Sequence, residues 1–190
     1  MTLPERSAAE AARELADALE RAAIPYAIGG ALSLAVAGVP RGTADVDINV
    51  FVPVSATPHV LATLAECGVS ADEEASLARA EHDGMFVGRW DGMRIDVFLP
   101  SIPFSDEAAR TRRRISDESG WSGWFLSPEA LSVFKLLFFR GKDMVDLERL
   151  VAVSGPALDH AYVRRWIVEM MGEDDPRTER WDQIVERFGG

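Results

Sequence analysis

An alternating stretch, DVDINV at residues 45–50, constrains this chain more than any other segment. Successive side chains of a β-strand point to opposite faces, so the three apolar residues share one face, and Asp45, Asp47 and Asn49 share the other. Aspartate is disfavoured in strands, and two neighbouring carboxylates repel each other. A divalent cation between them would remove that repulsion. The stretch therefore predicts a strand whose acidic face either meets solvent or binds a metal ion.

A third aspartate lies in a second strand-like run, MRIDVFL at residues 93–99. The pair Asp91–Gly92, placed between two alternating runs, is typical of a hairpin turn with residues 85–89 as its first arm. Asp96 is flanked by β-branched residues, which favour a rigid strand. If this strand lies beside the first, three carboxylates converge. Such a triad can hold two divalent cations about 3.5–4 Å apart, which suits phosphoryl transfer.

A glycine pair precedes the acidic stretch. Gly29 and Gly30 follow a short apolar run, and residues 31–37 are predicted to form a helix. Glycine lets the backbone approach a ligand closely, and the free N–H groups at a helix start favour phosphate. The order of glycine pair, Asp-x-Asp and distal strand aspartate is more specific than any of the three motifs alone.

With these motifs the sequence resembles the DNA-polymerase-β-like nucleotidyltransferase superfamily. Within it, the chain is most similar to the AbiE-type (AbiEii/AbiGii) toxin nucleotidyltransferases, and the resemblance covers roughly residues 26–150. The closer match adds the pattern Arg41-x-Thr43-x-Asp45-x-Asp47 and the segment KLLFFRGKDMVDL at residues 135–147. Many members carry serine directly after the glycine pair, where this chain has Ala31. Phosphate binding is then left to backbone amides or to Ser33.

The resemblance implies an α/β (α+β) nucleotidyltransferase fold, with a short mixed β-sheet flanked by helices and a C-terminal helical bundle. We expect residues 1–126 to form the catalytic core and residues 127–190 a helical part packed on it, in one continuous unit. The implied reaction moves a nucleoside monophosphate from an NTP to an acceptor hydroxyl and releases pyrophosphate. The catalytic and metal-binding residues would be Asp45, Asp47 and Asp96, with two Mg²⁺ ions or Mn²⁺ in their place. The nucleotide-binding residues would be Gly29, Gly30, Ser33 and Lys135.

Lys135 stands in an apolar helical pattern. Its amine either contacts the triphosphate, as the resemblance implies, or reaches water while its stem covers apolar surface. Gly141 is predicted to end that helix, and Asp143 to cap the next one, with Asp146 three residues later. The resemblance alternatively places Asp143 and Asp146 near the active site. Both alternatives stay open for each of these residues.

One basic cluster stands out in an acidic chain. Residues 105–107 favour a helix start, and the helix runs into the cluster formed by Arg110, Arg112, Arg113 and Arg114. The cluster either contacts phosphates of an RNA acceptor or of the nucleotide, or it forms a solvated helix face balanced by nearby acids. The formal net charge of −11 argues against broad, nonspecific nucleic-acid binding.

The remaining composition narrows the class of protein. An apolar content of 47% supports a real core, and Cys67 is the sole cysteine, which excludes an intrachain disulfide and a cysteine-based zinc site. Residues 22–40 carry no charge before Arg41, but prolines and glycines make them a poor membrane helix. No signal peptide is evident, so we expect a cytoplasmic protein without a membrane partner.

Three functions remain open from the sequence. The first is a toxin-like enzyme that modifies RNA or a tRNA and is restrained by an antitoxin protein. The second is an enzyme that nucleotidylates a small molecule such as an antibiotic. The third is a catalytically retired fold that serves as a binding module, which Ala31 favours and the intact set of aspartates opposes.

Overall fold

The computed structural model describes residues 6–189, and the strands of this part form one mixed sheet in the order β3-β4-β2-β1-β6-β5. The central strand β2 pairs antiparallel with β1 and parallel with β4. The predicted α/β class and short mixed sheet are confirmed. The strands are β1 (Tyr26–Ile28), β2 (Asp45–Val50), β3 (Met85–Trp90), β4 (Met93–Phe98), β5 (Arg113–Ser116) and β6 (Ser122–Phe125).

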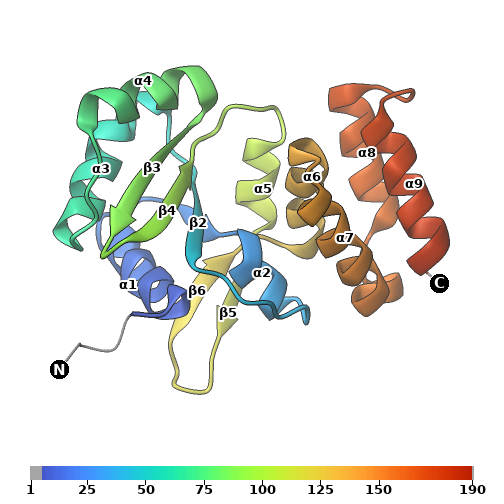
Figure 1. Ribbon diagram of the computed structural model, residues 1–190, viewed down its shortest axis with the longest axis horizontal. Coiled ribbons are helices and arrows are strands. Elements are labelled where there is room, and N and C mark those ends of the chain that lie inside the picture. Colours follow the sequence, from blue (N-terminus) through green and yellow to red (C-terminus); the bar gives the residue numbers. More distant parts are fainter. Residues whose placement is uncertain (1–5, 190) are drawn as a thin grey trace.

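The two strands predicted from alternation are present. Asp91 and Gly92 both have positive φ, of 50° and 86°, and join β3 to β4 as the predicted hairpin. On β2 the apolar side chains of Val46, Ile48 and Val50 are buried in a core that α1 and α3 share. The aspartates of β2 therefore lie on the opposite face, where α2 and α6 are found (Figure 1).

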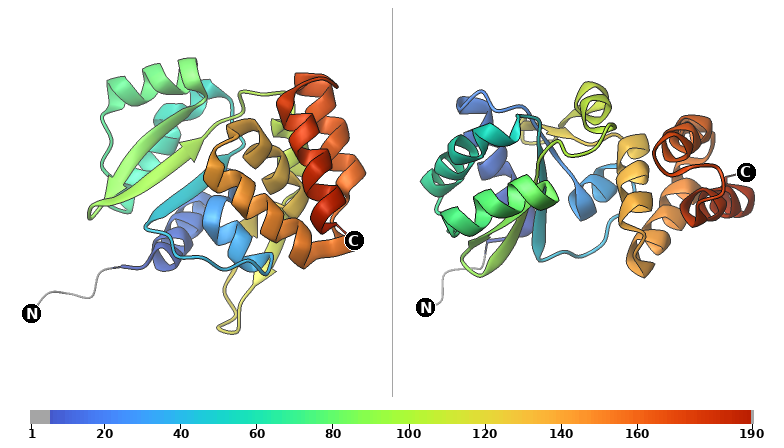
Figure 2. Two further views of the ribbon diagram at one scale, coloured as in Figure 1. Left: turned by 45° about the vertical axis from the view of Figure 1, so that its right-hand side comes forward. Right: turned by 90° about the horizontal axis from the view of Figure 1, so that it is seen from above.

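Helices flank the sheet and gather at one end of the molecule. α1, α3 and α4 pack on the sheet through one apolar core, whereas α6 to α9 form a second core with α2, and they lie beside the sheet (Figures 1 and 2). Among residues 6–189, none of the helices combines the length and the apolar character that a membrane span requires. The helices are α1 (Ala8–Arg21), α2 (Gly30–Val36), α3 (Thr57–Glu66), α4 (Glu73–Asp83), α5 (Ser105–Thr111), α6 (Pro128–Phe138), α7 (Gly141–Ser154), α8 (His160–Met171) and α9 (Pro176–Phe188), with short 3-10 turns at Val54–Ala56 and Gly155–Ala157.

The junction between α6 and α7 differs from the sequence prediction. The first helix ends at Phe138, and Phe139 closes it with a left-handed backbone, so Gly141 begins α7 instead of ending α6. Arg140 is the capping residue of α7. Asp143 is the third residue of that helix, and its side chain accepts a hydrogen bond from the backbone N–H of Arg140. The predicted helix cap at Asp143 is therefore wrong by one turn.

The four arginines of the basic cluster also lie on different elements from those predicted. α5 ends at Thr111, because the chain turns to an extended conformation at Arg112 and enters the edge strand β5 at Arg113. The prediction that the four arginines share one helical face is therefore wrong. The boundary predicted between residues 126 and 127 stays a prediction, although α6 does begin directly after it, at Pro128.

Candidate functional site

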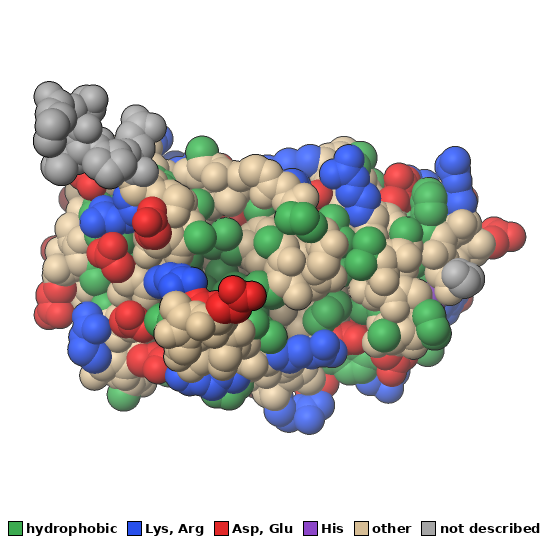
Figure 3. Space-filling view, turned by 90° about the horizontal axis from the view of Figure 1, so that it is seen from below, with side chains coloured by type: hydrophobic (Ala, Val, Ile, Leu, Met, Phe, Trp, Pro, Cys, Tyr) green, Lys and Arg blue, Asp and Glu red, His purple; other side chains and the backbone are tan. Residues whose placement is uncertain are grey.

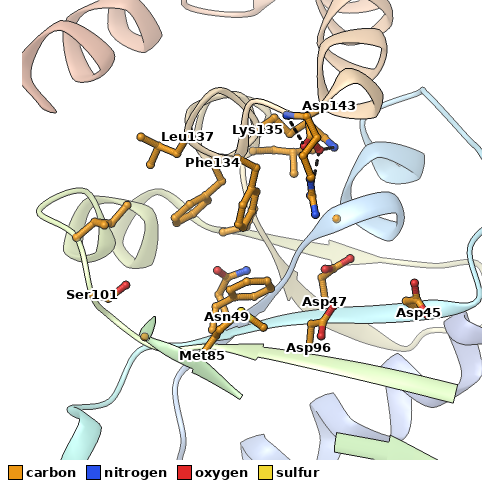
Figure 4. Close-up of a pocket in the computed structure, with 18 of the residues that line it drawn as sticks. Asp45, Asp47, Asn49, Met85, Asp96, Ser101, Phe134, Lys135, Leu137 and Asp143 are labelled. Atoms are coloured by element: carbon orange, nitrogen blue, oxygen red, sulfur yellow. Dashed lines mark hydrogen bonds and ion pairs between the residues drawn. The ribbon is translucent and has the colours of Figure 1, made fainter. Parts of the chain in front are cut away.

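A cleft of about 390 Å³ lies between the polar face of the sheet and the helices α6 and α7. One part is lined by charged side chains from β2, β4, α6 and α7. The other part is lined by apolar side chains, among them Phe98 and Phe138. Figure 4 shows two more of them, Met85 and Phe134. The residues that line the cleft therefore come from segments that are distant in the sequence and that the fold brings together.

We name the charged face of β2 and β4, with Asp45, Asp47, Arg94 and Asp96, the acidic wall. Its arrangement follows from the register of β2 against β4. Asp47 pairs with Asp96 on the neighbouring parallel strand, and Asp45 pairs with Arg94. Register partners project from the same face of a sheet, so three carboxylates and one guanidinium share this face. Figure 4 shows Asp47 and Asp96 side by side, with Asp45 further along β2. The structure thus places on one face the three aspartates that the sequence singled out, but it brings only Asp47 and Asp96 together, and Asp45 lies beside Arg94.

The electrostatics of this wall are unbalanced at Asp47. Burial raises the pKa of the Asp47 carboxyl above its ordinary value, and the carboxylate of Asp96 raises it further. Lys135 and Lys142 oppose that rise in the pKa from across the cleft. The Nε of Arg94 donates a hydrogen bond to Oδ1 of Asp96 at 2.8 Å. Asp47 has no such partner among the described residues, and a cation beside it would relieve the repulsion.

The glycine pair lies against the Asp47 side chain. The amide of Gly29 donates to the carbonyl of Asp47 at 2.8 Å, which extends the pairing of β1 with β2. Gly30 has a φ of +53°, and a Cβ at that position would overlap the Asp47 carboxylate. Any larger residue at Gly30 would therefore displace the acidic wall. The pair positions Asp47, and only Gly30 also lines the cleft.

Ser33, the predicted alternative phosphate contact, faces elsewhere. Its side chain is buried, and its hydroxyl donates to the carbonyl of Leu126 at 3.0 Å. Ser33 lines a different cavity, of about 290 Å³, beside β5 and the end of α7. Its role in nucleotide binding stays a prediction, to which this position adds no support.

Lys135 lies inside the protein between two carboxylates. Its side chain is only 5% exposed, and its Nζ lies 2.7 Å from Oδ2 of Asp146 and 3.4 Å from Oδ1 of Asp143. The sequence leaves triphosphate and water open as partners of this amine. The structure adds two buried acids on the next helix as its partners. Because Lys135 also lines the cleft, its contact with a triphosphate stays a prediction. Figure 4 shows Lys135 and Asp143 across the cleft from Asp47.

Two arginines complete this ion cluster from its outer side. The Nε of Arg41 lies 3.2 Å from Oδ1 of Asp146, and the Nε of Arg140 donates to Oδ2 of Asp143 at 2.6 Å. Burial alone would raise the pKa of Asp143, but the hydrogen bond from Arg140 and the charge of Lys135 outweigh burial and hold that pKa below its ordinary value. We name the group of Arg41, Lys135, Arg140, Asp143 and Asp146 the α6–α7 ion cluster.

Sequence reasoning missed the apolar part of the cleft. Phe98 lies beside Phe138 with a ring separation of 5.7 Å, and both rings line the cleft together with Phe134. Asn49, buried near them, stands on the predicted polar face of β2, so the alternation could have pointed to it. The aromatic residues carry no comparable signal, because their spacing on α6 also fits an ordinary helix core. The arrangement offers aromatic rings beside charged groups within one cleft.

The basic cluster is engaged within the protein. Arg110 pairs with Glu107, Arg113 with Glu129, and Arg114 with Glu20. Arg112 stacks on the ring of Trp124 at 4.6 Å and donates to a backbone carbonyl. On the face in Figure 3, Lys and Arg side chains are scattered among Asp and Glu. The cluster therefore resembles a set of local ion pairs more than a phosphate-binding surface.

The acidic wall fits a hard divalent cation in its donor chemistry. Carboxylate oxygens are the ligands that Mg²⁺ prefers, and burial together with the charge of Asp96 raises the pKa of Asp47, so a cation beside it would favour its charged form. Across residues 6–189, no three His, Cys, Asp or Glu side chains stand close enough to form a complete metal site. Mg²⁺ commonly takes one or two carboxylates and completes its shell with water and substrate phosphates. The wall is consistent with a cation that one or two aspartates hold together with water, and whose shell substrate phosphates complete.

No family model matches the sequence, and no curated protein matches it. The structure is similar to that of the antibiotic-resistance factor ANT(2'')-Ia, solved with adenylyl-2''-tobramycin, at 15% identity and a TM-score of 0.49 over 93% of this chain and 96% of the other. It is also similar to an antigenic nucleotidyltransferase-like protein from Paracoccidioides brasiliensis, at 16% identity and a TM-score of 0.45 over 90% and 89% of the two chains. A candidate nucleotidyltransferase from Thermotoga maritima has 18% identity and a TM-score of 0.46 over 89% and 96%. At these identities and scores, the likeness determines neither the fold family nor the activity of this chain.

Proposed function

We propose that this protein is a metal-dependent nucleotidyltransferase, which moves a nucleoside monophosphate from an NTP to an acceptor hydroxyl. One observation carries the proposal. The parallel register of β2 and β4 sets Asp47 beside Asp96 inside a cleft, where burial and the charge of Asp96 raise the pKa of the Asp47 carboxyl. Aspartate is disfavoured within strands, and its burial beside a second carboxylate costs stability. Such residues indicate a binding function, because a structural role would favour apolar or paired side chains.

The opposite wall supports a polyphosphate as part of the ligand. Lys142 and Arg140 line the cleft from the start of α7, and both side chains are largely exposed. A cleft with acids on one wall and cations on the other suits a ligand that itself carries both charges. A divalent cation bound to a triphosphate has this character: the metal would meet the aspartates, and the phosphates would meet the basic side chains.

The proposed roles of the residues follow from their positions. Asp45, Asp47 and Asp96 would hold Mg²⁺ or Mn²⁺, which supplies neutralisation of phosphate charge when bound. Asp96 accepts the proton of the acceptor hydroxyl. The hydroxyl oxygen forms the new bond to the α-phosphorus as the bond to the pyrophosphate breaks, and the pyrophosphate leaves with the electron pair.

The other cleft residues position the nucleotide. Lys135, held fixed by its two carboxylates, contributes positive charge that favours the developing negative charge on the leaving group. Gly30 lets the start of α2 lie close to the phosphates. The aromatic part of the cleft, with Phe98 and Phe138, offers stacking area for a flat ring of either substrate.

The acceptor is a second part of the proposal. A toxin-like action on RNA or tRNA, with an antitoxin partner, rests on the motif resemblance alone. The arginines that favoured an RNA acceptor are paired within the protein, and the chain carries a net charge of −11. Both observations favour a small acceptor, of neutral or positive charge, over a polyanion.

The test is a transfer assay with each α-labelled NTP, in the presence and absence of Mg²⁺, against pooled RNA and a panel of hydroxylated small molecules. Wild type should release pyrophosphate and label an acceptor only with the metal present. Asp96→Asn should lose transfer. Asp106→Asn, which changes an exposed acid at the start of α5, is the matched control and should retain it. Full activity of the Asp96 variant would contradict the proposal.

A further inference from the structure

Arg94 occupies one corner of a square of charged side chains. Asp45 and Asp47 stand two residues apart on β2, and their register partners on β4 are Arg94 and Asp96. All four residues line the cleft. The guanidinium of Arg94 therefore has Asp45 as its cross-strand neighbour and Asp96 as its neighbour along the strand, and it already donates to Asp96 at 2.8 Å.

This placement differs from that of an ordinary surface ion pair. The Asp96 side chain is 15% exposed, whereas the Arg94 side chain is 44% exposed. The carboxylate is thus held within the cleft, and the guanidinium covers it from the solvent side. An arginine keeps its positive charge at any physiological pH. A divalent cation that approached Asp96 would meet both this charge and an oxygen already engaged in a hydrogen bond.

We propose that Arg94 acts as a built-in cation of the acidic wall. It neutralises Asp96, and it excludes a second divalent ion from the nucleotide-free protein. The inference rests on the proposed function, since it assumes that the aspartates bind metal. Under it, the free chain binds one ion, near Asp47 and away from Arg94. A second ion enters only when the Arg94 side chain moves out to solvent, which its exposure permits.

Mn²⁺ binding measured by electron paramagnetic resonance, without nucleotide, tests this inference independently of activity. The variants are Arg94→Gln, Arg94→Lys and the control Arg89→Gln. Arg89 is the cross-strand neighbour of Arg94 on β3, carries the same charge and is exposed. Circular dichroism and thermal melts verify that each variant is folded.

Wild type and Arg89→Gln should bind one Mn²⁺ with the same affinity. Arg94→Gln should bind a second ion, with an affinity at least about tenfold higher than any second site of wild type. Arg94→Lys, which keeps the charge, should retain the single ion. Equal stoichiometry and affinity in wild type and Arg94→Gln would overturn the inference and leave the proposed function standing. No Mn²⁺ binding by wild type or by any variant would also overturn the inference, and the transfer assay with Mg²⁺ and NTP would then decide the proposed function separately.

Discussion

The acidic wall on β2 and β4 and the α6–α7 ion cluster face each other across one cleft, yet they satisfy their charges in opposite ways. Asp143 and Asp146 are buried and contacted by Lys135, Arg41 and Arg140. On the acidic wall, Arg94 is the one cation that contacts a carboxylate among the described residues. The pKa shifts follow this difference, because the pKa of Asp143 is lowered and that of Asp47 is raised.

The comparison separates structure from function within one site. A carboxylate that the fold supplies with cations stabilises the fold and has little left to offer a ligand. A carboxylate that is buried beside another one costs stability, and it gains when a cation binds. The first kind here ties α6 to α7 and to the segment before β2. The second kind is where we expect the chemistry. If this division is right, substitutions on the two walls will have different effects on transfer and on stability.

Asp96→Asn should reduce transfer by about 10²–10⁴-fold, because the acceptor hydroxyl loses its proton acceptor. Some nucleotide binding should remain, since Asp45 and Asp47 are intact. Pyrophosphate release and nucleotide titration of the same preparation would measure the two effects. Loss of nucleotide binding together with transfer would instead indicate that Asp96 acts in nucleotide binding and not as the proton acceptor.

Lys135→Met should destabilise the protein by about 3–5 kcal/mol, because it leaves two buried carboxylates with fewer counterions. Urea unfolding measures the loss. The contrasting variant Lys142→Met, at an exposed position of α7, should change stability little while weakening nucleotide binding. A stable Lys135→Met protein would show that the ion cluster is not structural.

The two walls should also respond oppositely to pH. A carboxyl whose folded-state pKa is raised contributes stability below its unfolded pKa, and that contribution is lost as the pH rises through the folded pKa. At pH 7 and without metal, Asp47 therefore costs stability, and Asp47→Asn should raise the melting temperature by about 2–4 °C, equivalent to about 1 kcal/mol. Near pH 3.8, the ordinary value for this group, the gain should shrink.

For Asp143 the sign is reversed. Its lowered pKa contributes stability above the unfolded pKa, and this contribution is lost as the pH falls. Asp143→Asn should therefore destabilise at pH 7 and approach wild type in acid. Thermal melts of both variants at neutral and acid pH in EDTA would test the contrast. If both substitutions changed the melting temperature at pH 7 in the same direction, the distinction between the acidic wall and the α6–α7 ion cluster would be wrong.

The smallest effect is expected outside the cleft. Arg113→Ala breaks an exposed pair with Glu129 and should cost about 0.2–1 kcal/mol. Transfer to the preferred acceptor should not change. A strong loss of transfer with an RNA acceptor, but not of stability, would restore the basic cluster as an acceptor surface.

Much of the acidic wall could be predicted from the sequence. Period-two alternation set the face of Asp45 and Asp47, and the Asp91–Gly92 turn fixed the hairpin that carries Asp96. Both signals are local. The parallel pairing of β2 with β4 depends on distant contacts, so the register that sets Arg94 beside Asp45 could not be derived from either segment alone.

The α6–α7 ion cluster was harder to predict for the same reason. The partners of Lys135 lie 8 and 11 residues further along the chain, beyond a helix end that was placed incorrectly at Gly141. A left-handed Phe139 closes α6, and no pattern in the sequence favours a bulky residue there. The arginine cluster was likewise divided by a helix-to-strand turn that its composition does not indicate.

The most direct measurement is calorimetric titration of each NTP, with and without Mg²⁺, into wild type and Asp47→Asn. Asp106→Asn serves as the control for loss of one negative charge. If the acidic wall binds a metal–triphosphate complex, wild type and the control will bind at least one NTP only with Mg²⁺, and Asp47→Asn will lose that binding while remaining folded. Mg²⁺-dependent binding that persists unchanged in Asp47→Asn, or its absence from wild type with every NTP, would contradict the account.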